Sequence, residues 1–168
     1  MITQARAKEA FEYNQETGEL IHTGKSCPRL KGIVAGYVKQ KGYVAISIDG
    51  REYLAHQLVW VHQTGCWPSK SIDHINRVKS DNRMVNLRMA NVSENNSNVG
   101  ISQKNTTGFK GVYRSGSNGR YRAMIGSAKS LKYLGCFGSP REAAMAYDAA
   151  AIKLHGQFAV TNRSLGFL

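Results

Sequence analysis

Ile72-Asp73-His74-Ile75-Asn76 is followed along the chain by Asn86-Leu87-Arg88 and then by Ser93-Glu94-Asn95-Asn96. Hydrolysis of a phosphodiester needs a base that deprotonates water, a divalent cation on the phosphate, and a group that aims the base. A neutral imidazole, with a pKa near about 6.5, serves as such a base at cellular pH. His74 is therefore a candidate base, and Asp73 with an amide oxygen is a candidate ligand pair for a hard cation.

The spacing of these residues resembles that of the HNH (ββα-metal) endonucleases. Asn86 lies twelve residues after His74, and Asn95 lies nine residues after Asn86. The resemblance is strongest to the phage homing-endonuclease branch, in which Asn replaces the last His of the motif, and it covers roughly residues 11–98. It implies that His74 is the general base and that Asp73 and Asn95 bind the metal. It also implies that Asn86 holds the ββ-turn and orients His74 through its carbonyl group.

The resemblance also implies the cofactor and the products. We expect Mg²⁺ or Mn²⁺ at the site, with Arg88 and Lys79 near the scissile phosphate, and products with 5′-phosphate and 3′-hydroxyl ends. No structural zinc is expected, because the chain's three cysteines are far apart and form no CxxC pair. One base and one metal cut one strand, so a monomer should nick DNA and a homodimer could cut both strands.

Ahead of this motif, the first 55 residues read as a small antiparallel sheet. Alternation and turn residues predict a short helix over 5–13, strands at 20–22, 34–38, 42–48 and 52–55, and a hairpin turn at Asp49-Gly50. Residues 56–62 have helical spacing, and Gly65 is a suitable cap. We expect His56 to be structural or a substrate contact rather than a ligand. The other histidines belong to no constellation.

The C-terminal part reads as a second domain. A polar run without periodicity at 96–107 predicts a linker, and we place the domains at 1–98 and 108–168 with 99–107 between them. Strands are predicted near 109–114, 120–125 and 131–137, with turns at 115–119 and 126–130. A helix from Pro140 to about His155 should be capped by Ser139 and end before Gly156.

This second domain resembles the Apetala/ethylene-response-factor DNA-binding domain found in plants and in phage nucleases. The resemblance rests on Phe109 to Arg114, Tyr121 to Ile125, Tyr133 to Phe137 and Glu142 to Asp148. It implies a three-stranded sheet in the major groove with a helix behind it. The implied DNA contacts are Lys110, Tyr113, Arg122, Met124 and Tyr133, with the Tyr147 hydroxyl near a phosphate and Arg114, Arg120 and Lys132 as further contacts.

Elementary patterning agrees with this interpretation. Tyr121, Ala123 and Ile125 alternate with Arg120, Arg122 and Met124, so one strand face is apolar and the other can reach phosphates or base edges. The alanines of the C-terminal helix are expected to be core. Leu131 and Tyr113 stand where plant members often carry base-reading arginines, so we do not expect the plant type of sequence preference.

Charge limits the class of partner. Lys and Arg number 23 against 11 Asp and Glu, a net charge of +12, which favours a polyanion such as double-stranded DNA. No apolar run approaches the roughly 20 residues of a membrane span, and the first residues do not resemble a signal peptide. We expect a cytoplasmic protein, in a bacterial host cell if it is phage-encoded, without a membrane partner, as a monomer or homodimer.

The sequence thus predicts an α+β fold and a metal-dependent DNA endonuclease of the homing type that nicks or cleaves DNA. Two alternatives remain open. One is a non-catalytic, sequence-specific DNA-binding protein with a decayed nuclease half. The other is a restriction or degradative nuclease that uses the same chemistry.

Overall fold

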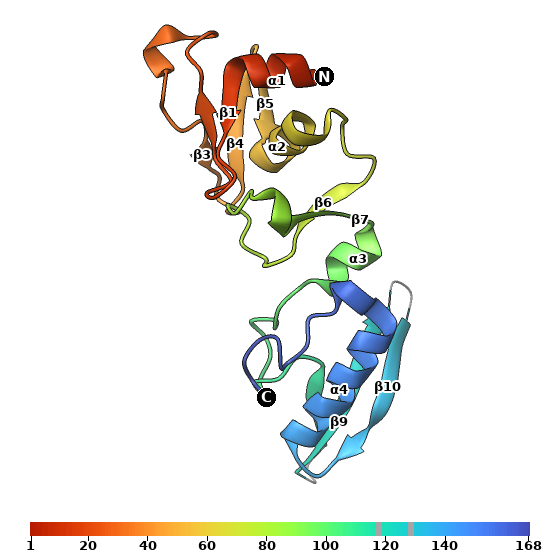
Figure 1. The fold of residues 1–168 in the computed structure, drawn as a ribbon. Helices are drawn as coiled ribbons and strands as arrows, with labels where there is room; N and C mark the ends of the chain where they lie inside the picture. The colour runs from red at the N-terminus through yellow and green to blue at the C-terminus, as the bar shows by residue number, and fades with distance from the viewer. Residues whose placement is uncertain (117–118, 128–129) are drawn as a thin grey trace. The chain divides into compact units, whose positions relative to one another are not determined.

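The computed structural model describes residues 1–116, 119–127 and 130–168. The chain divides into two compact units, unit 1 (Met1–Asn91) and unit 2 (Val92–Leu168). Both mix helices with small antiparallel sheets, so the predicted α+β class is confirmed (Figure 1). Within the described residues, no helix combines the length and the apolar character that crossing a bilayer requires.

Unit 1 contains two helices, three small sheets and two 3-10 turns. Its elements are α1 (Gln4–Ala10), β1 (Phe11–Tyr13), β2 (Leu20–His22), η1 (Pro28–Leu30), β3 (Tyr37–Val38), β4 (Val44–Ile48), β5 (Arg51–Leu54), α2 (Ala55–Thr64), β6 (Ser71–His74), η2 (Met84–Asn86) and β7 (Leu87–Ala90). The sheets are β1-β2, β3-β4-β5 and β6-β7, all antiparallel.

Local chemistry explains several of these boundaries. Asp49 and Gly50 both have positive φ, 51° and 70°, as a two-residue hairpin turn between β4 and β5 requires. Helix α2 ends at Gly65, whose φ of 81° is left-handed and whose N–H donates to the Val61 carbonyl. The predicted turn and the predicted helix stop are therefore confirmed.

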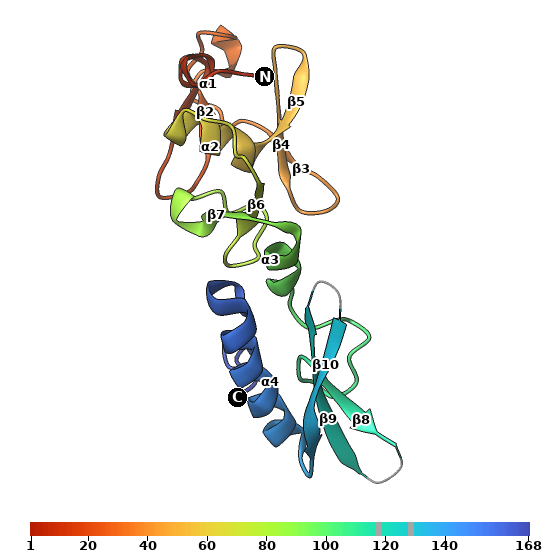
Figure 2. The same ribbon diagram turned by 90° about the vertical axis from the view of Figure 1, so that its right-hand side faces the viewer.

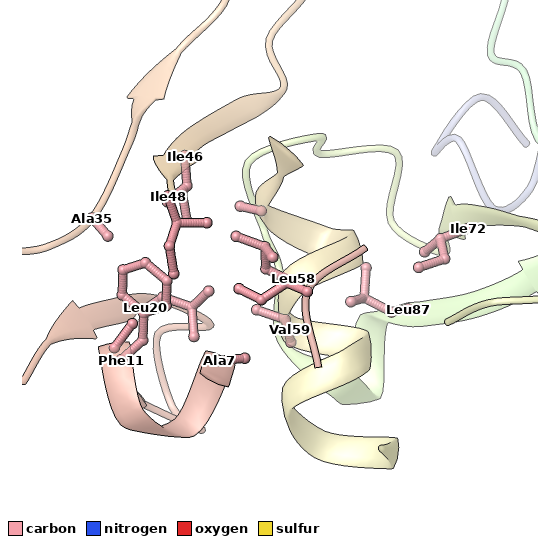
Figure 3. Close-up of a cluster of buried hydrophobic side chains, with 13 residues drawn as sticks. Ala7, Phe11, Leu20, Ala35, Ile46, Ile48, Leu58, Val59, Ile72 and Leu87 are labelled. Atoms are coloured by element: carbon pink, nitrogen blue, oxygen red, sulfur yellow. The ribbon is translucent and has the colours of Figure 1, made fainter. Parts of the chain in front are cut away.

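The core of unit 1 gathers around α2 (Figure 3). Leu58 and Val59 are fully buried and lie between the β1–β5 region, which contributes Phe11, and the β6-β7 hairpin. Ile72 of β6 and Leu87 of β7 also belong to this cluster. Ile72 immediately precedes Asp73 and His74, so packing of the hairpin against α2 fixes the backbone that carries the candidate base.

Unit 2 is a three-stranded sheet covered on one face by a helix (Figure 2). Its elements are α3 (Val92–Ser97), β8 (Val112–Ser115), β9 (Arg120–Ser127), β10 (Ser130–Phe137), α4 (Pro140–His155) and η3 (Gly156–Phe158), with the sheet order β10-β9-β8. Ala143 and Ala144 are fully buried against Val112 and Ala123. Small side chains allow α4 to lie close to the sheet, as predicted, and Ser139 caps it through the Glu142 N–H at 3.2 Å.

The structure differs from the predictions at several element ends. The first helix stops at Ala10 rather than 13, because Phe11 to Tyr13 pair with β2. The predicted strand at 34–38 is reduced to Tyr37–Val38, with Val34 in an isolated bridge to Ile21. The strand predicted from 109 begins at Val112, after Gly111 at φ 73°. The predicted turns at 115–119 and 126–130 include residues 117–118 and 128–129, which lie outside the described residues.

The boundary between the units lies at Asn91–Val92, earlier than the end of the first domain expected at 98. Helix α3 groups with unit 2 for a physical reason. The Ser97 hydroxyl lies 3.0 Å from His155 Nδ1, and Lys110 Nζ donates to the carbonyl of Ser97 at 3.2 Å. The segment 99–107, predicted as a linker, is also part of unit 2, where Asn105 Nδ2 donates to the Phe109 carbonyl at 2.7 Å.

Candidate functional site

The β6-β7 hairpin carries the candidate base of unit 1. In its register Asp73 lies opposite Arg88 and His74 lies opposite Leu87. Asp73 and His74 are 6% and 4% exposed, which is unusual for polar side chains and calls for partners. Each of them has such partners.

Asp73 forms an ion pair with Arg88 across the hairpin. Arg88 Nε and Nη2 donate to Asp73 Oδ2 at 2.9 and 2.8 Å, and both side chains are largely buried. Two donors from one planar guanidinium hold the carboxylate in a fixed orientation. Arg88, expected beside the phosphate, therefore contacts the proposed metal ligand in this structure.

His74 lies in a ring-lined environment. Its Nε2 is 3.2 Å from Asn82 Oδ1, and because an amide oxygen only accepts, Nε2 is the donor of this hydrogen bond. Burial lowers the pKa of His74, partly offset by the hydrogen bond to Asn82. His74 is thus a neutral imidazole at neutral pH, which is the form that can accept a proton from water.

His56 packs edge-on against His74. Their ring centroids are 5.1 Å apart at 88°, and the Tyr43 ring lies 5.5 Å from His56 and 6.0 Å from His74. His56 Nδ1 is buried and, among the described residues, has no hydrogen-bond partner. Burial, with a smaller contribution from His74, lowers the pKa of His56 to about 4. The structure therefore places His56 as a neutral ring that packs against the candidate base.

Asn86 ties together the loop between β6 and β7. Its Oδ1 accepts from the Asn76 N–H at 2.9 Å, and its Nδ2 donates to the Asp81 carbonyl at 2.8 Å. Its main-chain carbonyl accepts from the Ile75 N–H at 2.9 Å. The resemblance implied that this carbonyl orients His74, whereas the imidazole Nε2 lies at hydrogen-bond distance from Asn82 Oδ1, which accepts.

The same loop is stiffened by Asp81. Arg83 contacts its carboxylate at 2.6 and 2.8 Å, and Asn76 Nδ2 donates to it at 2.6 Å. The Arg83 hydrogen bond is the main reason why the pKa of Asp81 falls to about 2. The loop that carries Asn82 is therefore held from both ends.

The four residues of the predicted nuclease motif are divided between the units. Asp73, His74 and Asn86 lie within one hairpin and its loop in unit 1, and Asn95 lies half-buried on α3 in unit 2. Sequence reasoning missed Asn82 and Tyr43. No spacing rule marks an asparagine eight residues after a histidine as its partner. Within the described residues, no three His, Cys, Asp or Glu side chains gather to hold a metal.

In unit 2, most of the predicted DNA contacts lie at the surface. Tyr113 and Tyr133 are 45% and 57% exposed. Tyr113 lies opposite Arg122, and Tyr133 lies opposite Met124, in the sheet register. The other exposed members of the predicted set are Arg114, Arg120, Arg122 and Lys132.

Lys110 and Tyr147 have other surroundings. Lys110 is half-buried, and its Nζ donates to the carbonyls of Ser97 and Val99. Tyr147 is 6% exposed, and burial raises the pKa of its hydroxyl to about 12. Its ring covers Gly111 so closely that a Cβ there would be 1.9 Å from Tyr147 Cδ2. Both residues thus have structural contacts in unit 2, whatever they contribute to DNA binding.

Comparison with known proteins finds likenesses of two kinds. A family model described as HNH endonuclease matches residues 53–97, which include all four residues of the motif. The AP2-like ethylene-responsive transcription factor ANT of Arabidopsis thaliana is 52% identical over 56 residues, 32% of this chain and 10% of that protein. The ethylene-responsive transcription factor WRI1 of Arabidopsis thaliana is 35% identical over 96 residues, 56% of this chain and 20% of that protein.

A rice protein, the AP2-like ethylene-responsive transcription factor CRL5 of Oryza sativa subsp. japonica, is 50% identical over 56 residues, 32% of this chain and 9% of that protein. The chain thus spans a fifth or less of the length of these curated relatives. The endonuclease model and the transcription factors are both classes that act on DNA.

Proposed function

We propose that the chain is a metal-dependent DNA endonuclease of the HNH type, with unit 2 as its DNA-binding part. The observation that carries the proposal is the buried, neutral His74, whose Nε2 proton is held by Asn82 beside the ion-paired Asp73. A base kept neutral by burial and held in one tautomer is prepared to accept a proton at neutral pH. The match to the endonuclease model supports this assignment.

His74 takes a proton from the attacking water. The edge-on His56 ring and the Asn82 hydrogen bond hold the imidazole plane, while Asn86 keeps the loop in place. Carboxylate and amide oxygens suit a hard divalent cation by donor type, and Asp73 and Asn95 are the proposed ligands. Bound Mg²⁺ or Mn²⁺ would stabilise negative charge on the phosphate and on the departing 3′-oxygen.

A finer proposal concerns the biological type. With one base per chain, each chain should nick one strand, and a homing-type enzyme is our preferred role. The transcription-factor relatives favour a second candidate, a DNA-binding protein without catalysis. A plasmid-nicking assay in Mg²⁺ and in EDTA separates the two. Nicking that requires the cation supports the nuclease, and its absence over a range of metals contradicts it.

Asp73→Asn tests the proposed ligand. It keeps the size of the side chain but removes the charge, so we expect cleavage to require at least tenfold more Mg²⁺, with partial rescue by Mn²⁺. Arg88→Gln is the matched control, because it breaks the same ion pair and leaves the carboxylate in place. Melting curves of both variants account for lost stability. Equal metal requirements in Asp73→Asn and Arg88→Gln would remove Asp73 from the metal site.

A further inference from the structure

Helix α4 covers one face of the unit 2 sheet and leaves the opposite face uncovered (Figure 2). The uncovered face carries exposed aromatic and apolar side chains. Side chains of a strand alternate between faces, and Ala123 and Ile125 of β9 are buried on the α4 side. Met124 therefore lies on the other face, in register with Tyr133. Tyr133 is 57% exposed and Leu131 is 58% exposed. Large apolar groups are thus exposed to water on this face, where polar side chains would have a more favourable free energy of hydration.

This face is hollowed beside the apolar side chains. An open hollow of about 320 Å³ is lined by Tyr113, Met124 and Leu131 from the sheet and by Val99 and Ser102 from the preceding segment. Gly126 lies opposite Leu131 in the register, and a Cβ placed on it would be 3.9 Å from Leu131 Cδ1. The missing side chain leaves room at the floor of the hollow.

The charge around the hollow favours an anion. The sequence contains no Asp or Glu between Glu94 and Glu142, a span that includes the whole sheet. Arg120 and Arg122 are exposed on the central strand, and Arg122 pairs with Tyr113 in the register. An exposed apolar patch on a folded protein commonly marks an interaction site. A partner here should be a polyanion that also presents small apolar groups.

Duplex DNA has one such group at its base edges. The C5-methyl group of thymine projects into the major groove, where it makes apolar contacts with proteins, whereas guanine and adenine present hydrogen-bonding atoms. We infer that Tyr113, Met124 and Leu131 contact thymine methyl groups, so that the chain prefers duplexes with thymine at these positions. The inference rests on the proposed function of unit 2 in DNA binding and adds the kind of base pair that it selects.

The test uses the full chain in EDTA, so that DNA is bound without being cut. Duplexes retained from a random-sequence pool are sequenced, and their thymidines are replaced by deoxyuridine, which pairs in the same way but lacks the methyl group. We expect affinity to fall about fourfold for each contacted methyl group, from the usual gain on burying one carbon. Retained duplexes without thymine, or equal affinity for both forms, would overturn the inference.

Two double variants locate the effect. Met124→Ala/Leu131→Ala should lose most of the discrimination and retain no more than the roughly fourfold preference of the one methyl contact that Tyr113 still makes. Met145→Ala/Leu154→Ala is the matched control, since these residues are 55% and 49% exposed on α4. This control should distinguish the thymidine and deoxyuridine duplexes as strongly as the unmodified chain does. Equal loss of discrimination in both variants would overturn the assignment to the sheet face.

The outcome also separates this inference from the proposed function. A chain that retains and cuts DNA in Mg²⁺ without distinguishing thymine from uracil would contradict only the methyl contacts. A chain that retains no duplex from the pool would contradict both. A chain that binds and discriminates but does not cut would support the inference and contradict the nuclease.

Discussion

The functional side chains of the candidate site in unit 1 are buried, whereas those on the uncovered sheet face of unit 2 are exposed. Asp73, His74 and Asn86 are all less than a tenth exposed, and each has partners within the same hairpin or loop. Tyr113 and Tyr133 are about half exposed. Chemistry on a phosphate needs groups that do not reorganise during the reaction, whereas reading a base sequence needs side chains that can reach outward. The comparison predicts different responses to mutation in the two regions.

The largest expected effect is that of His74→Ala on catalysis. Loss of a general base should lower the cleavage rate by roughly 10²- to 10⁴-fold. DNA affinity should stay within about twofold, because a neutral side chain contributes little to the charge of the chain. Single-turnover cleavage and binding in EDTA measure the two quantities. His22→Ala is the control, a histidine of unit 1 outside the candidate site. A near-normal cleavage rate in His74→Ala would contradict the assignment of His74 as the general base.

Next in size is the effect of pH on unit 1 through His56. Its folded-state pKa of about 4 lies below the ordinary value of 6.5, so the unfolded chain takes up a proton first as pH falls. The contribution of neutral His56 to the free energy of unfolding is therefore complete above pH 6.5 and is lost as the pH falls from 6.5 to about 4. The expected loss is on the order of 3 kcal/mol.

His56→Phe keeps a ring in place but cannot titrate, so its free energy of unfolding should fall less over this range. Urea unfolding followed by tryptophan fluorescence measures it, because both tryptophans, Trp60 and Trp67, belong to unit 1. Asp81, with its pKa near 2, acts only at lower pH. Parallel pH profiles for the two proteins would contradict the neutral, buried state of His56.

The smallest expected effect comes from the exposed arginines of unit 2. Arg120→Gln/Arg122→Gln should reduce the slope of log affinity against log salt by about 0.9 for each lost phosphate contact. Stability should change by less than about 0.5 kcal/mol, as is usual for exposed positions. Arg141→Gln/Lys153→Gln removes two exposed charges from α4 as a control. A shift of equal size in both variants would mean that general charge, rather than the sheet face, determines the affinity.

Elements with local signals were predicted closely. Ser139 and Gly156 bound α4, and Gly65 ends α2, because caps satisfy backbone groups within a few residues of themselves. Elements without such signals were not. The helix predicted through residue 13 ends at Ala10, because pairing of β1 with β2 satisfies the same backbone groups as strand. Helical spacing alone cannot reveal that competition.

The residues of the candidate site also differ in whether the sequence could predict them. The sequence indicated Asp73, His74, Asn86 and Asn95 by type and spacing, and the structure places three of them together in unit 1 and one on α3 of unit 2. It did not indicate Asn82 as the partner of His74 or Arg88 as the partner of Asp73. These contacts follow from the shape of the loop and from the β6-β7 register, which the order of residues does not display.

By itself the sequence determined the α+β class, the positive charge, the types of residue at the candidate site and the turns that glycine and caps specify. These features depend on composition or on neighbours a few residues apart. Only the tertiary structure decided that His56 packs against His74 and that α3 is held in unit 2 by a Ser97–His155 contact across 58 residues. Such contacts depend on how distant segments pack, because a side chain's burial and partners are properties of the folded chain and not of its neighbours in sequence.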